Sequence, residues 1–393
     1  MKRKQLFLFI LIFSLGMTSC SLFETDDQNA DNTINNPYGA TILSCDDFND
    51  DIILEHTSGN MVDYIINCLV TVDNNVKVTI ADGAIVEFTE GSGFIFSQNS
   101  TLVFYALPGV VDPVILRGNK NEPGYWKGVH VASDQGSNFI LGVEILDAGS
   151  KSDPDFYGAI TVSGGCQIGN VIVSNSANYG IYFTDDYGTW NSFGEVEITR
   201  CDNYPIRIGA QEVWKLGNWS DNIFSDNNPN RIQVIPEEIF SQTRFNYKGI
   251  PYEVDGVITA SEGGIAIEDG VEIIFKRGSR LIIKTQLTAW ATENMPIKLY
   301  GHEGSAGSWQ GILLDTEGAD FWSTIDNVLI SDGGEEAFGS GNITLESGEL
   351  YLRNSRISNS RTCGVRVNLV DGILHETDNV YANNQGGNLC EEN

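Results

Sequence analysis

Basic residues are scarce in this chain. Its 393 residues include 23 Lys and Arg against 53 Asp and Glu, which gives a formal net charge of −30 at pH 7. Lys2, Arg3 and Lys4 fall in an N-terminal segment that we expect to be removed, which would make the mature protein more acidic still. A surface of this charge repels phosphate backbones and anionic membranes. Nucleic acid is therefore excluded as a partner, and acidic polysaccharides are disfavoured unless a divalent cation mediates.

The usual motifs of metal and hydrolase sites are also missing. The chain has no CxxC pair, no Gly-x-Ser-x-Gly and no EF-hand spacing in its acidic segment 46–51. These absences argue against a zinc site, an α/β-hydrolase and an EF-hand calcium site. A lone histidine on a strand is more often a surface or hydrogen-bonded residue than a catalyst. The four histidines are far apart in sequence and none has zinc-helix spacing: His56, His130, His302 and His375.

Amphipathic helical stretches of useful length are absent as well. From Tyr64 onward the chain consists of short alternating runs of four to six residues, each followed by Gly, Asn, Asp or Pro. Val76–Ile80, Ala84–Phe88 and Thr101–Ala106 are examples. Alternation with period two, interrupted by turn residues at such intervals, predicts β-strands.

A long internal repeat organises these runs. The segment DGAIVEFTEGSGFIF at Asp82–Phe96 returns 187 residues later as DGVEIIFKRGSRLII at Asp269–Ile283. Repeats of this kind decide architecture. We therefore predict two similar halves, 64–248 and 249–393, that differ in length only at turns. Two further blocks return 183 residues later, Pro113–Gly118 at Pro296–Gly301 and Trp126–Val129 at Trp309–Ile312.

A finer period of about 25 residues separates Gly180–Phe183 from Pro205–Ile208. That length suits one coil of a parallel β-helix, in which each strand stacks about 4.8 Å from its counterpart one coil later. A β-sandwich would have strands of similar length. Asn-Ser corners followed by Gly, at Asn175 and Asn359, favour the solenoid.

The repeated blocks resemble those of a known group of proteins. Asp-Gly-x-x-[Ile/Val]-x-Phe begins at Asp82 and Asp269, and Trp-x-Gly-[Val/Ile] begins at Trp126 and Trp309. Together with the Asn-Ser corners, they make the sequence similar to right-handed parallel β-helix lipoproteins of the Bacteroidetes type, within the pectate-lyase-like superfold. The resemblance implies an all-β, right-handed parallel β-helix from Tyr64 to the C-terminus. It does not imply an activity, because this architecture carries lyases, hydrolases, adhesins and inert spikes alike.

The N-terminus has the features of an export signal. Lys2–Lys4 precede the apolar run Leu6–Leu15, and Gly16–Cys20 supplies small residues before a cysteine. This pattern predicts a signal peptide over 1–19. It also resembles the lipobox of bacterial lipoproteins, which implies lipidation of Cys20 and anchoring to the outer membrane. Acidic residues after Cys20 resemble Bacteroidetes export signals, which implies the cell surface, with a periplasm-facing anchor as the alternative. Residues 20–40 are then a flexible acidic tether and 41–63 an N-terminal cap.

Six cysteines follow Cys20, an even number that suggests disulfides in an exported chain. On a β-helix, residues one coil apart lie within the Cα distance that a disulfide requires. We therefore predict a Cys363–Cys390 bond on the last coil and a Cys45–Cys68 bond at the other end. For Cys166 and Cys201 the sequence leaves a bond and two buried thiols equally open.

Two groups of residues are candidates for a site. Asp185 and Asp186 lie in the loop FTDDYGTW, with Arg200 and Arg207 about one coil further on. In a polysaccharide lyase or glycoside hydrolase the carboxylates would hold calcium and an arginine would act as base or clamp. The alternative is that the aspartates are turn formers and the arginines solvated. No Gly-His-Gly of the polygalacturonase pattern is present.

The second group is aromatic, since an exposed ring can stack on a sugar. Tyr187, Trp190, Trp214 and Trp219 cluster in loop-like sequence without duplicates, whereas the duplicated Trp126 and Trp309 suit core or corner packing. We therefore predict a monomeric surface module that binds glycan or protein. A calcium-dependent polysaccharide lyase or glycoside hydrolase and a purely structural protein are the alternatives. No dedicated metal site is predicted, and calcium is the one cofactor that stays open.

Overall fold

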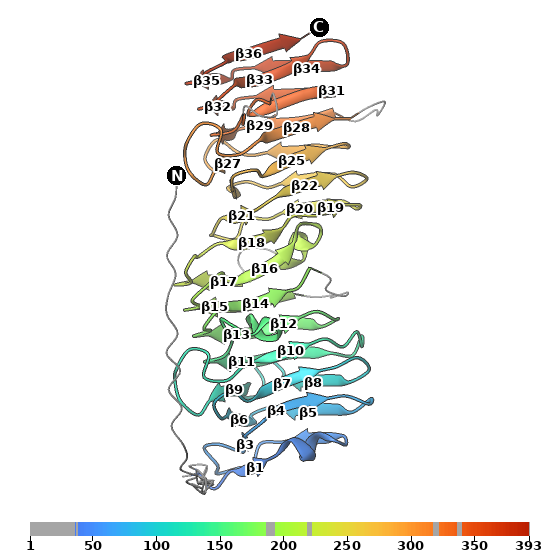
Figure 1. Ribbon diagram of the computed structural model, residues 1–393, viewed down its shortest axis with the longest axis vertical. Coiled ribbons are helices and arrows are strands. Elements are labelled where there is room, and N and C mark those ends of the chain that lie inside the picture. Colours follow the sequence, from blue (N-terminus) through green and yellow to red (C-terminus); the bar gives the residue numbers. More distant parts are fainter. Residues whose placement is uncertain are drawn as a thin grey trace, which may run out of the picture. The chain divides into compact units, whose positions relative to one another are not determined.

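The computed structural model describes residues 36, 38–185, 193–217, 222–316, 322–335 and 340–392. The unit Tyr38–Asn393 is a right-handed parallel β-helix of about 13 turns, with 49% strand and 4% helix, which confirms the predicted fold class (Figure 1). The predicted signal peptide, Cys20 and most of the predicted tether lie outside the described residues. Within the described ranges, no helix has the length and apolar character needed to cross a membrane.

One sheet runs through the whole unit and gains one parallel strand per coil (Figure 1). Its 13 strands are β4 Leu69–Val72, β7 Gly93–Phe96, β10 Val129–Val131, β12 Gly158–Val162, β14 Tyr179–Phe183, β16 Ile206–Gly209, β18 Ile232–Ile235, β21 Tyr252–Val254, β24 Glu272–Phe275, β27 Ile297–Gly301, β30 Val328–Ser331, β32 Arg356–Ser358 and β35 Val380–Ala382.

Two further sheets complete the coils, one in each half of the chain. The 11-stranded sheet contains β1 Thr41–Leu43, β2 Ile52–Leu54, β3 Tyr64–Ile66, β5 Lys77–Ala81, β6 Ile85–Phe88, β8 Thr101–Tyr105, β9 Val114–Gly118, β11 Phe139–Leu146, β13 Gln167–Ser174, β15 Phe193–Thr199 and β17 Asn222–Ser225. The 12-stranded sheet contains β19 Glu238–Ile239, β20 Thr243–Phe245, β22 Val257–Ala260, β23 Ile265–Ile267, β25 Arg280–Ile283, β26 Leu287–Trp290, β28 Gly311–Asp315, β29 Trp322–Asp326, β31 Ile343–Arg353, β33 Cys363–Asn368, β34 Gly372–Thr377 and β36 Gly387–Glu392.

Within the described residues, three short 3₁₀ helices interrupt these strands: η1 Cys45–Phe48, η2 Pro154–Phe156 and η3 Ala210–Leu216. The predicted cap region, 41–63, holds β1, η1 and β2. Within it Phe48 is buried and packs edge-on against Phe94 of β7, at 5.4 Å between ring centroids. An aromatic side chain of η1 therefore covers part of the first core layer.

The core is a stack of like residues, because alternation points every second side chain inward. On β8, Leu102 and Phe104 have no exposed surface, and they pair with the equally buried Val78 and Ile80 of β5. The same arrangement repeats along the unit and forms a single hydrophobic core. Each coil thus contributes one apolar layer and relies on its neighbours to cover it.

Left-handed Asn and Asp residues form the corners that the sequence showed as Asn-Ser. Asp147 and Asn175 have φ of 65° and 61°, and the Asn175 amide donates to Asp147 Oδ1 at 2.6 Å. Asp332 and Asn359 repeat this arrangement, with φ of 69° and 54° and the same 2.6 Å bond. Asn and Asp tolerate this conformation better than other side chains, which explains their choice at these turns.

The duplicated aromatic residues also make duplicated contacts. Phe88 stacks on Trp126 with ring centroids 4.0 Å apart, and Phe275 stacks on Trp309 at 4.1 Å. Neither tryptophan has exposed surface. Each indole Nε1 donates to a backbone carbonyl, at 2.7 Å for Trp126 and 2.8 Å for Trp309. The prediction that these two tryptophans pack in the core is confirmed.

The repeated segments nevertheless occupy different faces of the solenoid. β6 belongs to the 11-stranded sheet, but its repeat β24 belongs to the 13-stranded sheet. β7 belongs to the 13-stranded sheet, and its repeat β25 to the 12-stranded sheet. The 13-stranded sheet is continuous across the predicted junction, because β18 pairs with β21 in parallel. The second repeat is therefore displaced by one face around the axis.

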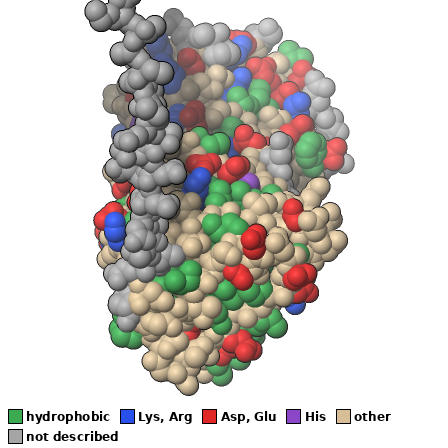
Figure 2. Space-filling model, turned by 60° about the horizontal axis from the view of Figure 1, so that its bottom comes forward, with side chains coloured by type: hydrophobic (Ala, Val, Ile, Leu, Met, Phe, Trp, Pro, Cys, Tyr) green, Lys and Arg blue, Asp and Glu red, His purple; other side chains and the backbone are tan. Residues whose placement is uncertain are grey.

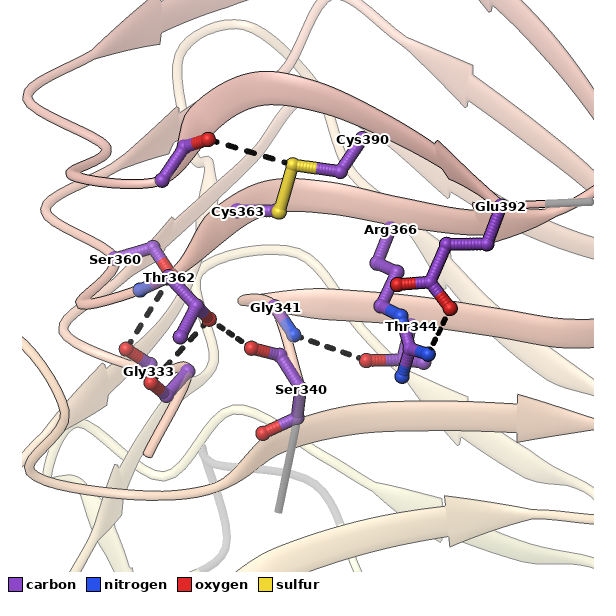
Figure 3. The surroundings of a disulfide bond; sticks show 12 residues. Gly333, Ser340, Gly341, Thr344, Ser360, Thr362, Cys363, Arg366, Cys390 and Glu392 are labelled. Carbon is purple, nitrogen blue, oxygen red and sulfur yellow. Dashed lines mark hydrogen bonds and ion pairs between the residues drawn. A yellow bond between two sulfur atoms is a disulfide. The ribbon is translucent and has the colours of Figure 1, made fainter. Parts of the chain in front are cut away.

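Both predicted disulfides are present, and Figure 3 shows the surroundings of the Cys363–Cys390 bond. Cys45–Cys68 and Cys363–Cys390 each join Cα atoms 6.0 Å apart, across sequence separations of 23 and 27 residues. Cys166 and Cys201 are buried free thiols, so the alternative that left them unpaired is the correct one. Burial raises the pKa of each of these thiols to about 12.

Removal of the last disulfide should loosen the last coil. A bond closing a loop of 27 residues contributes about 3.5 kcal/mol by chain entropy. We expect amide hydrogen exchange of Gly387–Glu392 to accelerate at least tenfold in Cys363→Ser, while amides of β4 and β7 at the other end keep their rates. Cys390→Ser and the double variant should match Cys363→Ser. Unchanged exchange in β36 of all three variants would contradict the prediction.

Candidate functional site

The structure brings two of the predicted catalytic residues together. Asp185 follows β14 and forms an ion pair with Arg207 of β16. Arg207 also donates to the Phe183 carbonyl at 2.7 Å, and its guanidinium lies 4.9 Å above the Tyr182 ring. The Arg207 side chain is only 15% exposed, whereas that of Asp185 is 73% exposed. Arg207 is thus already held by a carboxylate, a carbonyl and a ring, and Asp186 lies outside the described residues.

Arg200 belongs to another group of residues. It occupies a corner with φ of 54°, at the place where neighbouring coils have Asp147 and Asn175, and it donates to Ser174 Oγ at 2.7 Å. With Arg117 these residues line a polar pocket of about 330 Å³. Burial raises the pKa of Asp147 within it. Arg200 is therefore placed for polar recognition, but it makes none of the contacts of the Asp185–Arg207 pair.

Only one of the four predicted ligand-binding aromatics is described. Trp214 lies on η3 and is 47% exposed, with the Lys215 ammonium 5.8 Å from its ring centroid. Lys248 Nζ donates to the Leu216 carbonyl at 3.1 Å, at the end of η3. Tyr187, Trp190 and Trp219 lie outside the described residues, so their role stays a prediction.

A larger groove lies on the 12-stranded sheet, and none of the predicted site residues lines it. It has a volume of about 570 Å³ and is bounded by β20, β23, β26 and the turns that follow them. We call it the Trp290 groove. Its lining residues are Arg244, Tyr247, Ala266, Ile267, Glu268, Asp269, Thr288, Trp290 and Met295.

Alternation along β26 places the main side chains of the Trp290 groove. Leu287 and Ala289 are fully buried, so Thr288 and Trp290 point outward. Thr288 pairs with Ala266 of β23, which contributes a second small side chain to the floor. Trp290 rises beside this floor with 65% of its surface exposed. A large, flat and uncovered ring thus borders a shallow surface on which apolar and polar side chains are mixed.

The charged residues of the Trp290 groove form only a weak ion pair with each other. Arg244 Nη1 lies 3.1 Å from Glu268 Oε1, and their side chains are 55% and 41% exposed. An ion pair this exposed contributes roughly 0–1 kcal/mol, so a ligand can exchange with it at little cost. Asp269 accepts a bond from Thr292 Oγ1 at 3.0 Å. The groove therefore offers donors and acceptors of both signs.

A second exposed tryptophan lies on the same outward face. Trp322 of β29 is 52% exposed, and Thr324 of this strand pairs with Thr288 of β26. Trp290 pairs with Asp326, four positions along β29 from Trp322. At about 3.3 Å per residue the two tryptophans are roughly 13 Å apart along the strand direction. The two threonines lie between them.

The sequence did contain a signal for the Trp290 groove. In LTAWA the inward positions are Leu and Ala, so a strand assignment already places the tryptophan outside. Tyr105 stands 185 residues earlier and is also exposed, at 43% against 65% for Trp290. Around Tyr105 the surface is apolar, with Val103, Phe139 and Leu141 lining a pocket of about 260 Å³. Both repeats thus have an exposed aromatic residue at this place. Charged side chains lie beside Trp290 in the second repeat, whereas apolar side chains surround Tyr105 in the first.

The surface charge and the metal-binding groups bear on which ligands the site can hold. On the face shown in Figure 2, acidic side chains outnumber basic ones and are spread over the surface. Among the described residues, no group of three or more His, Cys, Asp and Glu side chains could hold a metal ion. A calcium site at Asp185 and Asp186 stays a prediction, because Asp186 is not described.

Comparison with known proteins gave no relative: no protein-family model, no curated protein and no solved structure matches the chain. The fold therefore rests on the structure alone. The similarity to Bacteroidetes lipoproteins stays a prediction from the repeated blocks.

Proposed function

We propose that this protein is a surface-anchored glycan-binding module and that the Trp290 groove holds a neutral saccharide. The observation that carries the proposal is the Trp290 ring, 65% exposed on the wall of a groove of about 570 Å³. Ligand sites combine apolar or aromatic surface with a few polar groups that orient the ligand. Large exposed apolar side chains grouped on one face also mark interaction sites.

The chemistry of a sugar matches both parts of the Trp290 groove. The C–H face of a pyranose can lie on the Trp290 ring, while its hydroxyls exchange hydrogen bonds with Arg244, Glu268 and Thr288. Trp322 lies on the same face and extends the surface to a longer chain. An oligosaccharide is thus a better match than a single sugar.

A neutral glycan is favoured over an acidic one on electrostatic grounds. The chain carries a formal net charge of −30, and the Trp290 groove contains Glu268 and Asp269 against Arg244. A uronate polymer would meet repulsion on approach. Lipidation at Cys20 and display on the outer membrane complete the proposal, and they rest on the N-terminal sequence.

Binding should depend on Trp290. We expect the mature protein to be retarded in native gels that contain a neutral polysaccharide from a panel of laminarin, xylan and galactomannan. Trp290→Ala should weaken this binding at least tenfold, because the stacking surface is lost. Trp214→Ala is the matched control, a half-exposed tryptophan outside the groove, and it should bind like the wild type.

Three results would contradict the proposal. They are no retardation by any neutral polysaccharide, equal binding by Trp290→Ala, and loss of binding in Trp214→Ala alone. Polygalacturonate with and without calcium belongs in the same panel, with absorbance of unsaturated uronates as the readout. Product formation that is lost in Arg207→Ala would favour the lyase alternative instead.

A further inference from the structure

A serine and a histidine are hydrogen-bonded on the outward face of the 13-stranded sheet. His130 is the central residue of β10, and Ser163 directly follows β12, the next strand of that sheet. The Ser163 amide donates to the Val131 carbonyl at 3.0 Å, which fixes Ser163 beside β10. His130 Nε2 and Ser163 Oγ are 2.8 Å apart. This separation is within the reach required of a nucleophile and its base.

The other ring nitrogen faces a carboxylate. His130 is 8% exposed, and its Nδ1 is buried without a hydrogen-bond partner among the described residues. Asp155 of η2 places Oδ1 3.8 Å from this nitrogen. His130 is thus hydrogen-bonded through Nε2, as expected for a strand histidine, but its Nδ1 has no hydrogen-bond partner among the described residues. An unpartnered buried polar atom calls for an explanation, and function is one of the explanations.

The charge distribution decides which nitrogen carries the hydrogen. The negative charge of Asp155 favours the tautomer with hydrogen on Nδ1, which leaves the lone pair on Nε2. The Ser163 hydroxyl then donates to Nε2, the direction needed for proton removal. Burial lowers the pKa of His130, so the ring is neutral and able to accept a proton at pH 7. The Phe156 ring, edge-on at 6.2 Å between centroids, packs near the imidazole.

A second unpartnered polar atom lies in the next coil. Thr184 follows Phe183, which pairs with Val162, the residue before Ser163. The Thr184 amide donates to the Val162 carbonyl at 3.0 Å, so Thr184 is the neighbour of Ser163 along the stack. Its Oγ1 is buried without a hydrogen-bond partner. This hydroxyl therefore has a hydrogen to donate to a group bound at Ser163.

We propose that Ser163 is an activated nucleophile that takes acyl groups from small esters, with His130 as its base and Asp155 as the carboxylate that orients the base. Ser163 Oγ attacks the carbonyl carbon while its proton moves to His130 Nε2. Thr184 donates to the carbonyl oxygen as negative charge develops there. The bond from carbon to the alcohol oxygen then breaks, and the alcohol leaves with the proton held by His130. Water repeats the sequence on the acyl-serine, releases the acid and restores Ser163.

A fluorophosphonate probe tests the proposal on the folded, full mature chain. We expect one adduct, located on Ser163 by peptide mass spectrometry, and none after heat denaturation. The probe should label His130→Gln at least tenfold more slowly than the wild type. The labelling rate of Asp155→Asn should fall by a smaller factor. Ser358 is an internal control, because it lies on β32 of the same sheet and its hydroxyl contacts no histidine among the described residues. Trp290→Ala should label like the wild type, which keeps this test separate from glycan binding.

Hydrolysis of p-nitrophenyl acetate gives a second readout. It should be lost in Ser163→Ala and kept in Ser358→Ala, with folding of each variant checked by thermal melting. The proposal is overturned by an unlabelled wild type, by equal labelling of Ser163 and Ser358, or by an unchanged rate in His130→Gln. The labelling of Ser163 in the wild type tests the proposal without any variant. A variant that does not fold therefore leaves the test intact.

Discussion

Trp309→Ala is expected to lower the free energy of unfolding by about 3–5 kcal/mol. The indole has no exposed surface and stacks on Phe275 at 4.1 Å between centroids. Its Nε1 donates to the Ser331 carbonyl at 2.8 Å. In the alanine variant this carbonyl would lose its hydrogen-bond donor inside the core. Alanine would leave both a cavity and an unpaired acceptor, and both effects destabilise.

Urea denaturation followed by circular dichroism measures this loss. Trp126→Ala should cost about as much, because the Phe88–Trp126 contact is nearly identical at 4.0 Å. Trp290→Ala is the matched control, and an exposed tryptophan should cost no more than about 0.5 kcal/mol. A loss below about 1 kcal/mol in Trp309→Ala would contradict the role of these rings as core residues.

Glu253→Gln is expected to destabilise the protein by about 3 kcal/mol, near the lower end for breaking a buried ion pair. Glu253 is 1% exposed on β21, where its carboxylate lies 2.5 Å from Arg231 Nη1 and 3.2 Å from Lys276 Nζ. The Tyr204 hydroxyl donates to it, and His302 Nδ1 lies 3.3 Å away. Glutamine keeps the shape but leaves the two cations without a countercharge. Their partial exposure keeps the cost near the lower end.

The pH dependence of this effect has a definite sign. Burial raises the pKa of Glu253, but the bonds from Tyr204, Arg231 and Lys276 outweigh burial, so the pKa lies below its ordinary value of 4.5. A carboxylate with a lowered pKa contributes stability above its unfolded-state pKa and loses it as the pH falls further. The stability difference between wild type and Glu253→Gln should therefore be full at pH 7 and shrink below pH 4.5. A difference that stays constant from pH 7 to pH 3 would contradict this assignment.

The features that could be predicted from the sequence are local or one coil long. Alternation in runs such as Thr101–Ala106 points the apolar residues toward the core, and this does not depend on the sequence of the neighbouring coils. Cys363 and Cys390 are separated by one coil, so the solenoid alone brings them together. Asp185 and Arg207, 22 residues apart, meet for the same reason. Each of these inferences needs only the repeat length and the direction of the side chains.

The features that could not be predicted depend on coils of unequal length. His130 meets Ser163 across 33 residues, because the turn between their strands contains η2. Glu253 meets Arg231 across 22 residues and Tyr204 across 49, two coils away. The length of each turn decides which side chains become neighbours, and turn lengths show no period in the sequence. The Trp290 groove combines residues of three consecutive coils and was missed for this reason.

The displacement of the second repeat by one face shows what holds a solenoid together. At the junction a strand of one repeat pairs with a strand of a different position in the other, Ile232 with Tyr252, through ordinary parallel backbone bonds. The ladder does not distinguish between side chains, and the apolar interior accepts any inward Ile, Val, Leu or Phe. A donor coil spliced onto this stack could therefore be attached in any of three rotational settings. The setting that is chosen would decide toward which side of the solenoid a binding surface on the donor coil points.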